Sequence, residues 1–186
     1  MRFNVVLLAS TMALGGGCMI VRNPTPQELS ALDNPPFEVQ SKVAHLLPKA
    51  EAWYSQTEIQ LAPLGRSLTA DEVRTAIQLG VAEPEKVRVV VLDEFPMPKD
   101  EQLLAEAKKY GLGGWAEGGR SNGRVILLKP RVAHSPVVLR HELVHLAQQD
   151  RMGRTGFLRR YLIELEMMGY ARSPLELEAY AKQGAN

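Results

Sequence analysis

The sequence predicts an α+β fold, in which a small mixed or antiparallel sheet is combined with helices at both ends of the chain. Two apolar, β-branched runs lie in the middle of the chain, at 86–95 and 124–130. Segments with apolar residues at helical spacing dominate the beginning and the end. Strands gathered in the middle, rather than alternating with helices throughout, are typical of α+β proteins.

Length and composition indicate one soluble domain with a substantial core. The chain has 186 residues, of which 45% are hydrophobic and 23% are charged. Lys and Arg number 22 against 21 for Asp and Glu, so there is no overall basic field to attract nucleic acid. We therefore expect no nucleic-acid partner.

The first 17 residues have the layout of a secretory signal peptide. Arg2 precedes an apolar stretch from Val5 to Leu14, which is too short to span a bilayer as a mature helix. Cys18, the only cysteine, follows small residues and resembles the lipidated cysteine of a bacterial lipoprotein, although Gly15 stands where leucine is usual. The resemblance implies cleavage before Cys18, a lipid anchor in a membrane and a place in the bacterial cell envelope. An ordinary signal peptide that happens to contain a cysteine is the alternative.

The segment after Cys18 is expected to be a tether, and the domain is expected to span 37–186. Residues 18–36 are rich in proline and asparagine and weakly periodic. From Phe37 to about Tyr54, apolar positions predict a helix that is interrupted near Pro48.

Helix and strand signals then follow in turn. Thr69 is a plausible N-cap and Gly80 a stop, which predicts a helix over 69–80. The run 86–95 predicts a strand, and 99–111 returns to helical spacing.

The second half of the chain predicts a loop, a strand and three helices. The glycine-rich segment 113–123 predicts the loop, and 124–130 the strand. A serine followed by proline is a strong helix start, and it occurs twice. The predicted helices run from Ser135 to about Arg151, over 156–170, and from Ser173 onward.

Two histidines in the first of these helices form a candidate metal site. His141 and His145 are four residues apart, so a helix places both imidazoles on one face, where they can share a metal ion. Glu142 lies beside them and can reach a metal-bound water as a general base without binding the metal. The alternative is a helix whose histidines are satisfied by backbone groups or water.

A catalytic zinc ion needs a third protein ligand. No histidine follows His145 and no aspartate follows Asp150, so the candidates are later glutamates: Glu164, Glu166, Glu176 and Glu178.

The HELVH sequence with a carboxylate on a later helix resembles the gluzincins, the thermolysin-like zincin metallopeptidases. Several of these families carry the third ligand in an E-x-x-A pattern, which ELEA at 176–179 matches with Glu176. Tyr180 stands where many have Asp or Asn, so the partner of a zinc-bound histidine is unassigned. The resemblance covers about 135–182. It implies a zincin-like fold, one zinc ion (Zn2+) held by His141, His145 and Glu176, and Glu142 as catalytic base.

Glu176 has a competing interpretation. It lies three residues after Ser173, so it could close a capping box instead of binding a metal. Glu178 would then be the ligand, since it also satisfies E-x-x-A through Ala181. The two side chains point in directions roughly 200° apart on a helix, so only one is expected to reach the ion.

The resemblance also implies a function: a zinc-dependent peptidase of the cell envelope that acts on peptide or protein substrates. In such enzymes an edge strand often pairs with the substrate, and 124–130 is placed in the chain for that role or for a plain core strand. Candidates for stabilising an oxyanion are Tyr161, Tyr170, Tyr180 and His134. The alternative function is a non-catalytic zincin-fold lipoprotein that acts as a binding module.

Overall fold

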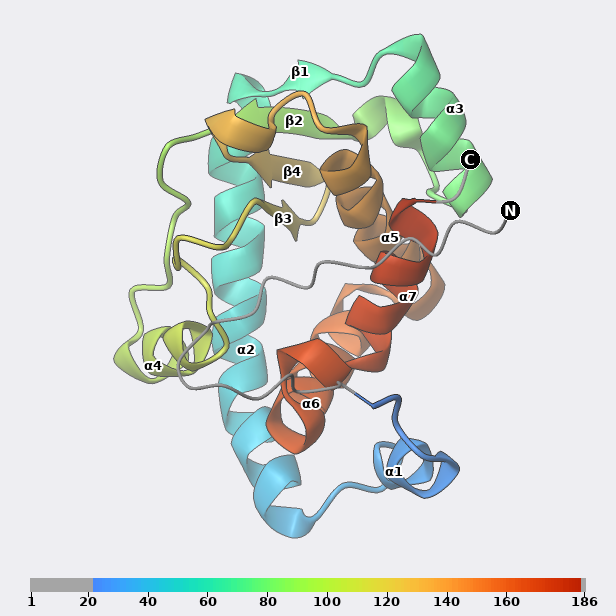
Figure 1. The fold of residues 1–186 in the computed structure, drawn as a ribbon. Coiled ribbons are helices and arrows are strands. Elements are labelled where there is room, and N and C mark those ends of the chain that lie inside the picture. Colours follow the sequence, from blue (N-terminus) through green and yellow to red (C-terminus); the bar gives the residue numbers. More distant parts are fainter. Residues whose placement is uncertain (1–21, 185–186) are drawn as a thin grey trace, which may run out of the picture.

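The computed structural model describes residues 22–184, and within them the fold is α+β with a small mixed sheet (Figure 1). The strand order is β1-β2-β4-β3, with β2 and β4 parallel and the two outer pairings antiparallel. The predicted signal peptide and Cys18 lie outside the described residues. The strands are β1 (Arg66–Ser67), β2 (Arg88–Val91), β3 (Gly119–Asn122) and β4 (Val125–Leu128).

Seven α-helices surround this sheet in the part of the chain that the structure describes. The capping signals at Thr69, Ser135 and Ser173 each form the expected side-chain bond to a backbone amide of the first turn. Helix starts at these positions are therefore confirmed. The helices are α1 (Pro26–Ala31), α2 (Phe37–Leu61), α3 (Ala70–Leu79), α4 (Glu101–Lys109), α5 (Pro136–Met152), α6 (Arg154–Met168) and α7 (Pro174–Gln183).

The sheet is covered on both faces. On one face, Ile126 and Leu128 of β4 pack against Leu143 and Leu146 of α5. On the other face, Leu127 and its neighbours pack against the C-terminal end of α2. Below the sheet, α6, α7 and the first half of α2 form a second, helical region, so α5 lies between the two (Figure 1).

Helix α2 is continuous for 25 residues, so the predicted interruption near Pro48 is wrong. Proline removes one backbone hydrogen bond, which by itself disfavours a helix interior. Buried residues on both sides of it, among them Leu46 and Ala50, hold the helix in the core. Tertiary packing outweighs the local penalty here.

The predicted loop at 113–123 is wrong in its last part, because Gly119–Asn122 form strand β3. This strand pairs with β4 through a tight turn at Gly123, whose φ is +61°. As a result β4 is an interior strand with all four residues buried, and β3 is the edge.

Residues 26–31, inside the predicted tether, form the capped helix α1. Thr25 and Glu28 form a reciprocal capping box. The next residue after the helix, Leu32, is buried in a cluster with Val43 and Ile163. This part of the segment therefore packs against the domain.

No helix within residues 22–184 has the length and apolar character needed to cross a membrane.

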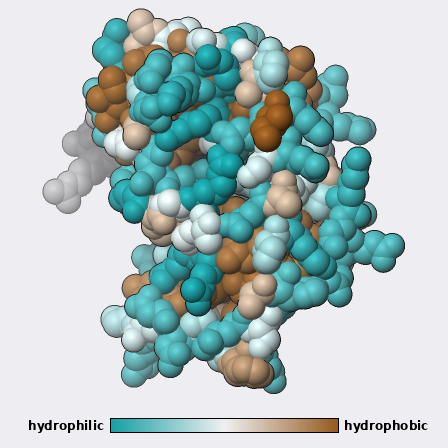
Figure 2. Space-filling model, turned by 180° about the vertical axis from the view of Figure 1, so that it is seen from behind, coloured by the Kyte–Doolittle hydropathy of each residue, from teal (hydrophilic) through white to brown (hydrophobic). Residues whose placement is uncertain are grey.

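The back of the molecule is mostly hydrophilic, with apolar side chains showing in a hollow across its middle (Figure 2). A cavity of about 260 Å³ lies between α2 and α6, lined by Gln40, Val43, Ala44, Leu47, Arg159 and Ile163. None of the candidate site residues lines this cavity.

An ionic cluster around Glu166 links α2, the end of α4 and α6, and we expect it to make stability fall in acid. Partial burial raises the pKa of Glu166, but hydrogen bonds from Lys42, Tyr110 and Lys109 outweigh it and lower the pKa from 4.5 to about 2. A carboxylate with a lowered pKa stabilises the fold above its unfolded pKa, and this contribution is lost as pH falls from 4.5 towards 2. In urea denaturation, Glu166→Gln should therefore lose less stability than wild type across that window. Glu94→Gln, at an exposed acid outside the cluster, should follow wild type; equal acid sensitivity in all three proteins would contradict the assignment.

Candidate metal centre

Helix α5 has two buried faces with different roles. Leu139, Leu143 and Leu146 pack against the sheet side of the core. His141 and His145 lie on the opposite side, one turn apart, against α7. The apolar face therefore anchors the helix, and the other presents two imidazoles to a neighbouring helix.

Three side chains from α5 and α7 converge at one point. The Nε2 atoms of His141 and His145 are 3.1 Å apart. Oε2 of Glu176 lies 3.3 Å from Nε2 of His141, and Oε1 lies 3.4 Å from Nε2 of His145. All three residues are buried, and together they form a group that could hold a metal ion.

The spacing of these atoms is compatible with a shared metal ion. Ligand atoms that lie about 2.0–2.2 Å from zinc in tetrahedral geometry are separated from each other by roughly 3.3–3.5 Å. The 3.1 Å between the nitrogens, and the nearest nitrogen–oxygen distances of 3.3 Å to Oε2 and 3.4 Å to Oε1, are close to these values. With one ligand atom from each residue, the three atoms lie within 4.8 Å of one another. Oxygen Oε2 of Glu176 is buried and has no hydrogen-bond partner among the described residues, which leaves a lone pair for a cation.

The outer nitrogens of both imidazoles are held by amide oxygens. His145 Nδ1 lies 2.8 Å from Oε1 of Gln148, and His141 Nδ1 lies 3.1 Å from Oε1 of Gln183. In neutral histidines these contacts place the proton on Nδ1, so that both Nε2 lone pairs point towards Glu176. Without a cation, the lone pairs of two nitrogens and a carboxylate would face each other. The donor set therefore fits a metal ion.

The structure brings Glu176, not Glu178, to the histidines. Glu178 instead forms ion pairs with Arg151 and Lys182. Glu176 does not close a capping box, although Ser173 caps α7 by accepting from its backbone amide.

The Ser173 backbone amide, from which a capping Glu176 would accept, donates instead to the carbonyl of Tyr170. Glu164 meets two other donors at the start of α7. Its carboxylate is buried and accepts hydrogen bonds from the hydroxyl of Ser173 and the backbone amide of Leu175. It is also paired with Arg160 on its own helix. Glu164, one of the four candidate ligands in the sequence, therefore stabilises the N-terminus of α7.

Electrostatics around Glu176 favour its ionised form. Burial raises the pKa of the carboxyl, but the two histidines in their protonated form and the hydroxyl of Tyr161 outweigh this and lower the pKa to about 2. The Tyr161 hydroxyl donates to Oε1 of Glu176 at 2.7 Å. The carboxylate is thus held charged and oriented towards the imidazoles.

Glu142 lies beside the centre but outside the converging set. Its carboxyl is buried, and burial raises its pKa, although the histidines act in the opposite direction. Its Oε1 faces the backbone of Gly119 so closely that a Cβ there would lie 2.6 Å away. Glycine at this position leaves room for the acid.

Gly119→Ala should therefore disturb Glu142 without touching the three converging residues. The added methyl would also lie 3.0 Å from Cγ1 of Val138, so two neighbours must shift. We expect a loss of about 1–3 kcal/mol in the free energy of unfolding, the usual cost of overpacking. Urea denaturation measures it. Gly156→Ala, where a Cβ would meet only Met152 at 3.5 Å, is the control, and equal stability of the two variants would contradict the close contact.

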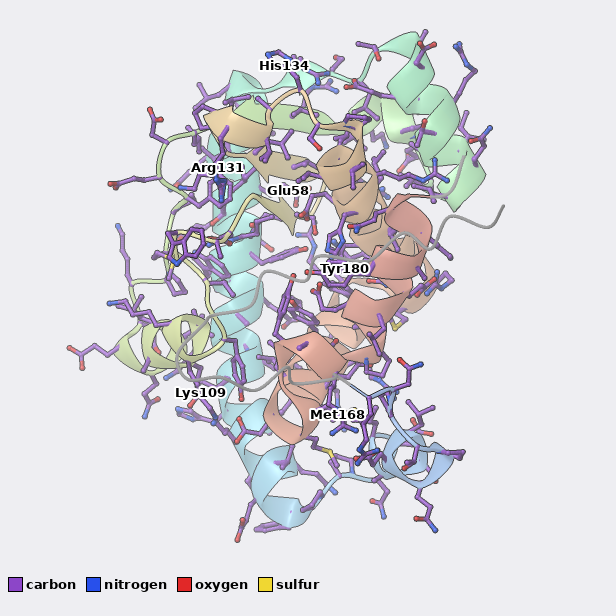
Figure 3. The ribbon with its side chains drawn as sticks, in the orientation of Figure 1. Glu58, Lys109, Arg131, His134, Met168 and Tyr180 are labelled. Carbon is purple, nitrogen blue, oxygen red and sulfur yellow. The ribbon has the colours of Figure 1, made fainter. Side chains whose placement is uncertain are left out.

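The tyrosines proposed to stabilise an oxyanion are near the centre, whereas His134 is not with them. Tyr180 lies edge-on to His141 with ring centres 4.8 Å apart, and its hydroxyl is 3.4 Å from that of Tyr170. The hydroxyl of Tyr161 already donates its hydrogen bond to Glu176, so it is not available to an oxyanion. Figure 3 shows Tyr180 in the middle of the molecule and His134 at the top. Tyr170 and Tyr180 remain candidates because both are partly exposed.

No family model, curated protein or solved structure matches this chain.

Proposed function

We propose that this protein is a zinc-dependent hydrolase of peptide bonds, with His141, His145 and Glu176 as zinc ligands and Glu142 as general base. The observation that supports this is the convergence of two imidazoles and a carboxylate at mutual distances of 3.1–3.4 Å. Two imidazoles and one carboxylate leave a position open for water, which is typical of catalytic rather than structural zinc.

The roles of the chain's own residues follow from their positions. A zinc ion held here would supply Lewis acidity and lower the pKa of a bound water to roughly 7. Glu142, next to a ligand and close to β3, would take the proton of the attacking water and pass it to the leaving amine. Tyr170 and Tyr180 would offer hydroxyl donors to the developing oxyanion.

The free edge of β3 supports an extended peptide as the substrate. The backbone amide of Lys129 donates to the carbonyl of Gly118, so Gly118 and Lys129, just before β3 and just after β4, form a hydrogen-bonded pair of the ladder. Because such pairs alternate in an antiparallel ladder, Gly119 and Ser121 turn their backbone groups away from β4, towards the free edge. No strand of residues 22–184 pairs with this edge. An extended chain could add to it at Gly119, which is the partly exposed residue of β3 and lies beside Glu142.

We also propose that the protein acts in the bacterial cell envelope, anchored through a lipid on Cys18. The support is the apolar stretch and the lone cysteine in the sequence, since these residues lie outside the described part of the chain.

Cleavage of a mixed peptide library by zinc-loaded and zinc-stripped protein tests the enzymatic proposal. We expect cleavage with zinc, none after chelation, and recovery when zinc is restored. Mass spectrometry of the products identifies the bonds that are cut. A protein that binds zinc and cleaves neither peptides, proteins nor wall peptides would contradict the proposal and favour a zinc-holding binding module.

A further inference from the structure

Gln148 is a fully buried polar side chain that links the candidate metal centre to α7. It lies three residues after His145, on the same face of α5, with an exposed fraction of 0%. Its Oε1 lies 2.8 Å from Nδ1 of His145. Its Nε2 donates to the carbonyl of Leu175 at 2.9 Å and to Oε2 of Glu178 at 3.0 Å.

These contacts define the orientation of the amide. Leu175 offers a carbonyl and Glu178 a carboxylate, and both only accept, so the amide nitrogen of Gln148 must point to α7. The amide oxygen must then point to His145, whose Nδ1 has to donate. The Nε2 of that histidine is left with its lone pair facing His141 and Glu176.

Glu178 is itself anchored. Arg151 donates to its carboxylate through both terminal guanidinium nitrogens, and Lys182 donates as well. The chain of contacts therefore runs from two surface cations through Glu178 and Gln148 to His145.

We propose that Gln148 is a positioning residue that selects the metal-binding tautomer of His145, with Glu178 as its anchor. This inference rests on the metal site of the proposed function, but not on peptide hydrolysis. A carboxylate commonly fills this place beside a metal-bound histidine, where it makes the imidazole more basic. The neutral amide of Gln148 orients the ring without adding a negative charge beside it. Glu178, the alternative ligand in the sequence, would then affect the metal indirectly, through Gln148 and His145.

Zinc affinity and the histidine tautomer together test the inference. We expect Gln148→Ala to bind zinc about 10–100-fold more weakly in competition with a chelator, the usual effect of losing such a partner. Gln149→Ala, at the adjacent and similarly buried position, should bind as wild type does. In zinc-free protein, nitrogen NMR should find His145 protonated on Nδ1 in wild type and as a mixture of tautomers in Gln148→Ala.

Exchanging the amide and the acid between positions 148 and 178 distinguishes a positioning role of Gln148 from a role in packing alone. In Gln148→Glu, the new carboxylate lies opposite the carboxylate of Glu178 and the carbonyl of Leu175. None of these groups can donate a hydrogen bond to the others, so zinc binding should weaken. Adding Glu178→Gln restores an amide donor opposite that carboxylate, and the double variant should regain most of the lost affinity.

The outcomes distinguish this inference from the metal site itself. Tight zinc binding by wild type, with equal affinity and the same tautomer in Gln148→Ala, would overturn the role of Gln148 and leave the proposed function standing. Failure of the double variant to recover, with its fold intact by circular dichroism, would also count against it. Absence of zinc binding in wild type would overturn both.

Discussion

Glu176→Gln is expected to abolish tight zinc binding while leaving the fold intact. The carboxylate supplies one of three ligand atoms and the only negative charge among them, so its loss removes both a bond and the charge balance of the site. The fall in affinity should exceed the roughly 100-fold upper range for changes outside the ligand set. The amide keeps the size of the side chain and an oxygen that can accept from Tyr161. Zinc content after dialysis and chelator competition measure the effect.

Glu178→Gln is the matched control, because it makes the same chemical change two residues away. Glu178 reaches the centre only through Gln148, so this variant should still bind one zinc ion, within about 100-fold of wild-type affinity. A result in which Glu178→Gln loses zinc and Glu176→Gln keeps it would show that the ligand had been misassigned. Circular dichroism of both zinc-free proteins checks that the fold survives.

The helix starts could be predicted because their signals are local. Ser135 and Ser173 each cap a helix whose first residue is proline, and both the hydroxyl and the ring act within one turn. His141 and His145 share a face for the same reason, since helical geometry depends on nearby residues alone. These parts of the fold and site needed no knowledge of tertiary contacts.

The choice between Glu176 and Glu178 could not be made from local signals. A serine followed at the third place by glutamate is compatible with a capping box, and no neighbouring residue excludes it. The Ser173 amide that a capping Glu176 would use donates to Tyr170 instead. Tyr161 of α6 holds Glu176, whereas Gln148 and Arg151 of α5 hold Glu178. Contacts between separate helices decide which acid faces the two histidines.

Strand β3 was missed for a related reason. Gly119–Asn122 has no β-branched residue, and glycine is rare in strands. The pairing with β4 holds it in the sheet, and Glu142 of α5 requires its glycine. The strand is therefore set by its tertiary contacts, with β4 and with a buried acid of α5, and not by its composition.

The partners of the histidines were also missed, although one had a signal in the sequence. Gln148 is three residues after His145, which places it on the same helix face. Gln183 comes from the far end of α7, and no spacing rule connects it to His141. Tyr180 fills the place of the expected Asp or Asn and packs on the imidazole ring, so the hydrogen bond comes from elsewhere.

Glu142→Gln should retain zinc and lose most of its hydrolytic activity. The carboxylate of Glu142 is not part of the converging set, so the three ligands remain in place. An amide cannot accept the proton of the attacking water, and positioned general bases contribute about 10²–10⁴-fold to rate. We expect kcat to fall by that factor on any peptide that the zinc-loaded wild type cleaves, with zinc content unchanged.

The same variant should be at least as stable as wild type, which separates catalysis from folding. Glu142 is buried and receives no hydrogen bond from the rest of residues 22–184, so its charge is costly to keep in the core. The neutral amide has nearly the same shape and removes that cost. An acid that destabilises its surroundings is retained more readily for chemistry than for structure. If Glu142→Gln unfolds at lower urea concentration than wild type and cleaves at the wild-type rate, Glu142 supports the fold and the base must be sought elsewhere.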